Sequence, residues 1–244
     1  MRRNHTPRVR MMKTCSWFVG ALIAVLLVGC ENSGSSGGMG TITTEGRPTT
    51  GVAYHSAGLG ETPVAVAVYK LPDVDNNGSP VTPLMFTSSM AIDADGMGDD
   101  GIGGKILDPQ YGQDDTALHY ASTGKPLDAR YVRYFVLPEG FNGQGSHPAV
   151  RLGDVAAVLY NGTLTYAIYG DVGAADDGLG NQLGEGSMAL ADALGIPNDP
   201  ANGGAVNGVV YIVFPGSGPG DVLSSDDINS IGHRLFTAAG GSAD

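Results

Sequence analysis

The stretch that decides the fold covers residues 155–169 and consists of VAAVLY-NG-TLTYAIY. Two apolar runs, rich in β-branched and aromatic side chains, flank the dipeptide Asn161-Gly162. Asparagine followed by glycine suits the positive φ angles of a tight type I′ turn. The stretch therefore predicts a β-hairpin with strands at residues 155–160 and 163–169.

Comparable apolar runs lie on both sides of this hairpin, and each ends at glycine, proline, asparagine or aspartate. They predict further strands at residues 64–69, 130–137 and 209–214. No internal repeat divides the chain, so these strands are expected to belong to one sheet system. Short strands joined by glycine-rich turns are typical of sandwiches and barrels.

Two helices complete the expected fold. One covers residues 187–194, and Gly195 follows as a stop signal. The other covers residues 226–237, where Ser225 precedes two aspartates that favour a helix N-terminus. The fold class predicted from these patterns is mainly β: a single compact β-barrel-like domain with a few short helices.

The first thirty residues have the layout of a bacterial lipoprotein export signal. Five basic residues and no acid precede an apolar stretch from Trp17 to Val28, which is shorter than the roughly 20 residues that span a bilayer. The stretch ends in LVGC, with small residues before Cys30, as in a lipobox. We predict a signal peptide over 1–29, a lipid on Cys30, and an extracytoplasmic protein tethered to the cell membrane or outer membrane. An uncleaved signal anchor is the alternative.

These boundaries set the domain organisation and the charge of the mature protein. Residues 30–50 are expected to form a flexible Gly/Ser-rich tether, and residues 51–244 a folded domain. The sequence has 13 Lys+Arg against 25 Asp+Glu; five of the 13 lie in the leader, so the mature chain keeps eight and has a net charge of −17. Such a charge argues against nucleic acid and would attract a polycation, although ordinary solubility also explains it. Cys15 leaves with the leader and Cys30 carries lipid, so no disulfide is expected.

Two aspartate-rich turns are the candidates for metal binding. The run from Asp73 to Gly78 matches the first half of a calcium loop, but Leu84 stands where a full loop needs a bidentate glutamate. A solvated turn is the alternative. The acids between Asp93 and Asp100 have the same ambiguity, and no two histidines are spaced for zinc. We predict that the protein functions without a metal or a cofactor.

Two carboxylates, Asp171 and Glu185, stand out beside a glycine-rich loop. Asp171 follows the second hairpin strand, and Glu185 precedes the first helix. Two acids facing each other across a cleft suit glycoside hydrolysis, which needs one protonated and one ionised carboxyl group. The alternative is structural: Asp171 starts a turn, and Glu185 helps to cap the helix.

Three stretches, in order, resemble the chitosanases of glycoside hydrolase family 75. They are MAIDADG at 90–96, YFVLP at 134–138, and the segment 152–187 with LGDVAAV, YAIYGD and GEGS; VYIVF at 210–214 matches as well. The resemblance covers roughly residues 85–215. It departs from the family pattern at Ala91, where aspartate is expected, and at Gly186, where alanine is expected.

The resemblance implies that residues 51–244 form a catalytic domain for endo-hydrolysis of the β-1,4 bonds of chitosan, with inversion at the anomeric carbon. It places the general acid on Glu185, which would protonate the leaving oxygen, and the base on Asp171, which would activate water. A carboxyl group near a helix N-terminus is favoured as an ion, whereas a general acid must hold a proton. Burial or a neighbouring charge must therefore outweigh the helix end, or the roles are exchanged.

The remaining acids suit a groove for a cationic sugar polymer. Asp93, Asp95, Asp114 and Asp115 are predicted to pair with ammonium groups, and Tyr166 and Tyr169 to share one strand face and stack on sugar rings. Solvated acids and core tyrosines are the alternative. The expected partners are chitosan and, through the lipid alone, a membrane; the protein is expected to be a monomer. A non-catalytic surface lipoprotein that binds a cationic glycan or calcium is the competing function.

Overall fold

The structure is a computed structural model, and it describes residues 38–42, 46–49, 53–60, 62–96, 115–139, 141, 150–173 and 181–243. The predictions for the signal peptide, for Cys30 and for Asp114 lie outside these residues. In the described part of the chain, the helices are too short or too polar to cross a membrane.

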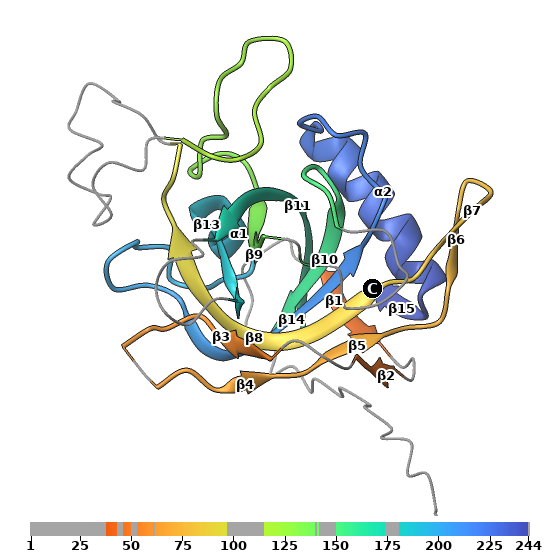
Figure 1. Cartoon of the computed structure of the whole chain (residues 1–244), viewed down its shortest axis with the longest axis horizontal. Helices are drawn as coiled ribbons and strands as arrows, with labels where there is room; N and C mark the ends of the chain where they lie inside the picture. Colours follow the sequence, from red (N-terminus) through yellow and green to blue (C-terminus); the bar gives the residue numbers. More distant parts are fainter. Residues whose placement is uncertain are drawn as a thin grey trace, which may run out of the picture.

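A closed barrel of six strands forms the centre of the molecule (Figure 1). In order around the barrel, its strands are β10 (Val155–Tyr160), β14 (Ala205–Phe214), β8 (Leu84–Asp93), β13 (Glu185–Ser187), β9 (Tyr134–Pro138) and β11 (Thr163–Gly173). Strand β11 pairs back with β10 and closes the barrel. The β8–β13 and β9–β11 pairs are parallel, and the other neighbours are antiparallel. The predicted mainly β, barrel-like class is confirmed.

The hairpin from which the fold was predicted is the β10–β11 pair. It runs without interruption from Val155 opposite Ile168 to Tyr160 opposite Thr163. The turn residues Asn161 and Gly162 have φ angles of 47° and 85°, the left-handed conformation that a type I′ turn requires. The prediction from the Asn-Gly dipeptide is therefore confirmed.

Both faces of the barrel wall are buried, which explains why its strands have nearly continuous apolar sequences. One set of alternating side chains forms an inner core: Leu84, Phe86, Met90, Ile92, Phe135, Leu137, Ala156, Val158, Ala167, Tyr169, Val209, Tyr211 and Val213. The opposite set packs outward with Ile228, Leu235 and Phe236 of α2 (Ser225–Ala238): Val155, Ala157, Leu159, Tyr166, Ile168, Val210, Ile212 and Phe214. The helix lies along the outside of the barrel in Figure 1.

Shorter elements surround the barrel. They are β1 (Gly38–Ile42), β2 (Arg47–Pro48), β3 (Tyr54–Ser56), β4 (Ala65–Val66), β5 (Val68–Lys70), β6 (Val74–Asn76), β7 (Ser79–Val81), β12 (Gln182–Leu183), α1 (Met188–Ala193) and β15 (Gly241–Ala243). Strand β1 pairs with both β11 and β15. Both predicted helices are confirmed, and their N-caps are Ser187 for α1 and Ser224, not Ser225, for α2.

Two predicted strands differ from the structure. The run at 64–69 is split into β4 and β5, and Val64 is 61% exposed, so it is not one buried strand. The strand predicted at 130–137 begins only at Tyr134. Before it, the backbone N–H groups of Tyr131 and Val132 both donate to the carbonyl of Asp128, which makes a turn in place of strand pairing.

Candidate active site

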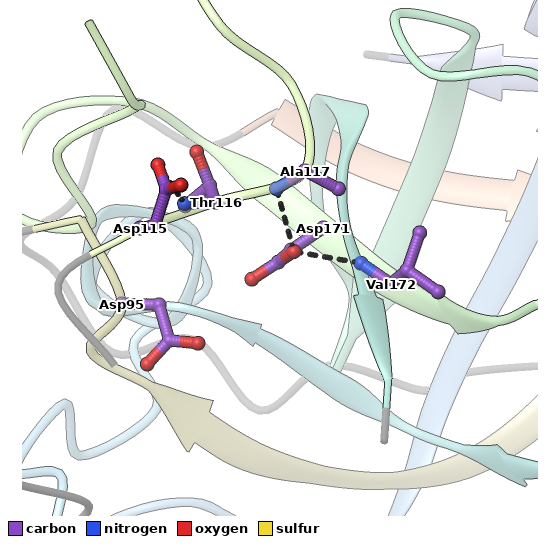
Figure 2. Close-up of a pocket in the computed structure, with 6 residues that line it drawn as sticks. All are labelled: Asp95, Asp115, Thr116, Ala117, Asp171 and Val172. Carbon is purple, nitrogen blue, oxygen red and sulfur yellow. Dashed lines mark hydrogen bonds between the residues drawn. The ribbon is translucent and has the colours of Figure 1, made fainter. Parts of the chain in front are cut away.

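Asp171 lies near the end of β11, at a β-bulge. In the parallel pairing with β9, Tyr169 is opposite Phe135 and Asp171 is opposite Val136, so Gly170 is the extra residue. The Asp171 side chain is buried, with a residue exposure of 8%. Its Oδ1 accepts hydrogen bonds from the backbone N–H groups of Ala117 and Val172, each at 2.8 Å, as Figure 2 shows. The bulge and these two donors fix the position of the carboxyl group.

Asp93 and Asp95, at the end of β8, face Asp171. One carboxylate oxygen from each of the three residues lies within 4.8 Å of the others, and all three residues are buried. Asp93 Oδ1 accepts a 2.7 Å hydrogen bond from the backbone N–H of Asp95. The phenol of Tyr134 approaches the same group and donates to the backbone carbonyl of Asp95 at 3.3 Å. We call Asp93, Asp95 and Asp171 the carboxylate cluster.

Burial and hydrogen bonding act in opposite directions on Asp171. Burial is the largest effect and raises the pKa of Asp171, whereas the hydrogen bonds from Ala117, Val172 and the Asp95 side chain lower it. The charge of Asp115 raises it again, and the net pKa lies above the ordinary aspartate value. The negative charge of the carboxylate cluster also acts on Tyr134. Burial, followed by the charges of the three aspartates, raises the pKa of Tyr134 well above 10.0.

The carboxylate cluster opens to solvent through a pocket of about 360 Å³. Its lining includes Asp95, Asp115, Thr116, Ala117, Asp171 and Val172 (Figure 2). The Asp115 side chain is 72% exposed at the pocket, and its Oδ1 lies 2.6 Å from His119 Nε2. Asp115 is thus positioned to meet a solvated cation, whereas Asp93 and Asp95 are only 3% and 7% exposed.

Glu185 lies on β13, two strands away from Asp171. Val136 of β9 is opposite Asp171 on one side and opposite Glu185 on the other. Residues directly opposite in paired strands project to the same face, so both acids flank Val136 on one face of the wall. Glu185 is half-buried, and its charge adds to burial in raising the pKa of Tyr211. The N-cap of α1 is Ser187, whose side chain accepts from Leu190 N–H, so the alternative in which Glu185 helps to cap the helix finds no support in these contacts.

The prediction that Tyr166 and Tyr169 share one strand face is wrong. Positions three apart on a strand project to opposite faces, because side chains alternate. Tyr166 packs outward against Phe236 of α2, and Tyr169 packs inward against Phe135. Burial raises the pKa of each tyrosine to about 12. With exposures of 7% and 5%, neither ring is presented to a sugar.

The calcium-like stretch forms the β6–β7 hairpin. Asp75 Oδ1 accepts a 3.0 Å hydrogen bond from Gly78 N–H, and Asp73 accepts one from the Thr82 hydroxyl. These contacts are those of a solvated turn. In the described part of the chain, the carboxylate cluster is the set of acids close enough to surround a cation or to share a proton.

Sequence reasoning named Asp115 but missed two neighbouring contributors to the site, Ala117 and Thr116. The segment 115–118 supplies the Ala117 N–H and follows the edge of β11, where Leu118 N–H donates to the Gly170 carbonyl at 2.9 Å. Thr116 is buried and braces this segment, since its Oγ1 donates to Leu118 O and accepts from Leu127 N–H. Backbone donors of this kind leave no residue-type signature.

A comparison with known protein families shows to which family the chain belongs. Residues 90–236 match the family model described as fungal chitosanase of glycosyl hydrolase group 75. The match covers more than half of the chain and includes the carboxylate cluster and Glu185. No curated protein matches the chain significantly.

Proposed function

Because the chain belongs to the fungal chitosanases of glycosyl hydrolase group 75, it is a glycoside hydrolase, and we propose that it cleaves chitosan with inversion, Asp171 being the general base and Glu185 the general acid. An inverting hydrolase needs one carboxyl group to protonate the leaving oxygen. It needs a second carboxylate to activate water on the opposite face of the sugar.

The observation that carries this proposal is the row Asp171–Val136–Glu185 across β11, β9 and β13. Neighbouring strands are about 4.8 Å apart, so the backbones of the two acids are about 9.5 Å apart. Carboxyl groups of inverting enzymes are separated by roughly 6.5–9.5 Å, and those of retaining enzymes by about 5–5.5 Å. Backbones about 9.5 Å apart, with both side chains on one face, allow the two carboxyl groups to adopt the wider spacing, which leaves room for a water molecule beside the anomeric carbon.

The surroundings of Asp171 support its role as the base. Two backbone N–H groups donate to Oδ1, and such donors favour the ionised carboxylate. Burial at the same time raises the pKa of Asp171, which makes the carboxylate a stronger base than an exposed aspartate. The backbone donors thus favour the carboxylate form of Asp171, and burial makes that carboxylate more basic toward water.

The exposed acid at the pocket supports a cationic substrate. Glucosamine units carry ammonium groups, and the largely exposed carboxylate of Asp115 can pair with one of them without a large desolvation cost. The net charge of −17 on the mature chain would raise the local concentration of such a polymer.

The test is hydrolysis of chitosan by the mature protein carrying Cys30→Ser, which removes the lipid site. This protein should release reducing ends from chitosan. A further Asp171→Asn or Glu185→Gln substitution should reduce kcat by at least about 100-fold. Asp75→Asn, in the exposed hairpin turn, is the matched control and should be as active as the parent. NMR of the first product should show the α-anomer, as inversion of a β-bond requires.

Two outcomes would refute this function. Binding of chitosan without release of reducing ends would favour the non-catalytic glycan-binding lipoprotein. Release of the β-anomer first would exclude inversion and the assigned roles of the two acids.

We also propose that lipid on Cys30 holds the enzyme at the outside of a membrane. The leader, its lipobox and the absence of acids before Cys30 support this location. Cys30→Ser should move the protein from the membrane fraction to the soluble fraction and abolish incorporation of labelled fatty acid. A variant that stays on the membrane would contradict the proposal.

A further inference from the structure

Asp95 does not have the surroundings of a residue that binds a solvated ammonium group. It is 7% exposed, and its carboxyl group lies beside those of Asp93 and Asp171. The carboxyl groups of Asp95 and Asp171 are close enough for a side-chain hydrogen bond. Two carboxylate ions are both acceptors and cannot form such a bond, so one of the pair must hold a proton.

The other contacts indicate which residue holds it. Asp171 Oδ1 accepts two backbone N–H groups, which favour its ionised form. Asp93 Oδ1 accepts the backbone N–H of Asp95 at 2.7 Å, which favours the ionised form of Asp93 as well. We propose that Asp95 is a positioning residue that is protonated and donates a hydrogen bond to the Asp171 carboxylate; this inference rests on the proposed role of Asp171 as the base.

This hydrogen bond would decide where the attacking water binds. An ionised carboxyl group has about four lone-pair sites. The N–H groups of Ala117 and Val172 take both sites on Oδ1, so the proton of Asp95 would occupy one of the two sites on the other oxygen. One site on that oxygen is then left for the water.

In the reaction, the proton of the water passes to this oxygen of Asp171 as the water oxygen bonds to the anomeric carbon. The glycosidic bond breaks, and the leaving oxygen takes the proton of Glu185. Asp95 keeps its own proton throughout, so its contribution is to orient Asp171 and to lower the pKa of Asp171 against the effect of burial.

The titratable groups around Asp95 come from four strands and one loop. They are Asp93 on β8, Tyr134 on β9, Asp171 on β11, Glu185 on β13, and Asp115 with His119 beside the pocket. All the carboxylates among them disfavour ionisation of Asp95 if they are charged, which keeps its proton in place.

The test compares Asp95→Ala with Asp95→Asn in the mature protein, with kcat and KM measured on soluble chitosan across pH. Alanine removes the donor, so kcat should fall at least tenfold, the acid limb of the pH profile should move to higher pH, and KM should stay unchanged. Asparagine keeps an N–H donor, so the acid limb should remain at its wild-type pH. If Asp95 instead binds ammonium, both variants will raise KM alike and leave the acid limb in place, which would overturn the proposal.

A measurement without turnover separates this inference from the proposed function. In ¹³C carboxyl NMR of the mature wild-type protein, Asp95 and Asp171 should titrate as a coupled pair, and Asp171→Asn should shift the titration of Asp95. Independent titration of the two groups would refute proton sharing, whether or not the protein hydrolyses chitosan. If Asp95→Ala fails to fold, the wild-type spectrum still tests whether Asp95 and Asp171 share a proton.

Discussion

The β-bulge that directs Asp171 toward the carboxylate cluster depends on the missing side chain of Gly170. A Cβ at this position would lie 2.5 Å from Tyr134 Cβ and 2.7 Å from Leu127 Cδ1. Ordinary contacts of a Cβ begin at 3.4 Å, so Gly170→Ala forces β11 and β9 apart by about 1 Å. Tyr134 is fully buried and cannot turn away.

We expect Gly170→Ala to weaken both stability and catalysis. Overpacking of this kind costs about 1–3 kcal/mol, which lowers the Tm of a domain of this size by roughly 2–12 °C. A displacement of about 1 Å at a catalytic group reduces the rate by roughly 100-fold, and kcat on chitosan should fall by that factor. Thermal unfolding followed by circular dichroism, together with a reducing-end assay, measures the two effects.

Gly58→Ala is the matched control, because no atom lies within 4 Å of its added Cβ and its φ is not in the left-handed region. Its Tm and kcat should equal those of the wild type. If Gly170→Ala behaves like Gly58→Ala, the bulge does not position Asp171 and the argument from close packing fails.

Three further predictions concern pH, salt and a buried acid. Because burial raises the pKa of Asp171, the acid limb of the kcat/KM profile should lie above the ordinary aspartate value of 3.8. Asp115→Asn removes a charge that raises this pKa, so it should move the acid limb to lower pH. An unmoved limb would show that the charge of Asp115 does not affect the pKa of Asp171. Added salt screens the attraction between the acidic chain and chitosan, so KM should rise between low and high ionic strength while kcat is constant, and a salt-independent KM would contradict electrostatic capture. Asp154 is 1% exposed and accepts hydrogen bonds from the backbone N–H groups of Arg151, Gly216 and Gly218. Asp154→Ala should therefore lower the free energy of unfolding by about 1–3 kcal/mol in urea titrations. A smaller loss than that of the exposed Asp199→Ala would show that these hydrogen bonds do not stabilise the fold.

The sequence predicted those parts of the fold that depend on neighbouring residues. The β10–β11 hairpin follows from Asn161-Gly162, and α2 follows from its acidic first turn and apolar face. The opposite orientation of Tyr166 and Tyr169 also follows from strand alternation, which the sequence prediction misapplied.

The parts that could not be predicted depend on pairing between distant segments. Asp93 and Asp171 are 78 positions apart in the sequence, and their contact requires the order β8–β13–β9–β11 around the barrel. Two of those pairings are parallel, and no turn signal specifies them. The sequence could therefore name Asp93, Asp95 and Asp171 one by one, but it could not show that they lie together.

The pairing of β1 with β11 determines how a lipid-anchored enzyme would face its surroundings. Strand β1 begins at Gly38, only eight residues after Cys30, and a chain of that length reaches about 28 Å at most. Gly38 is opposite Leu164, whereas Asp171 lies seven residues farther along β11, up to about 23 Å away. The eight-residue connection would keep the barrel close to the lipid surface, so an anchored enzyme would cut only polymer that comes within a few nanometres of the membrane.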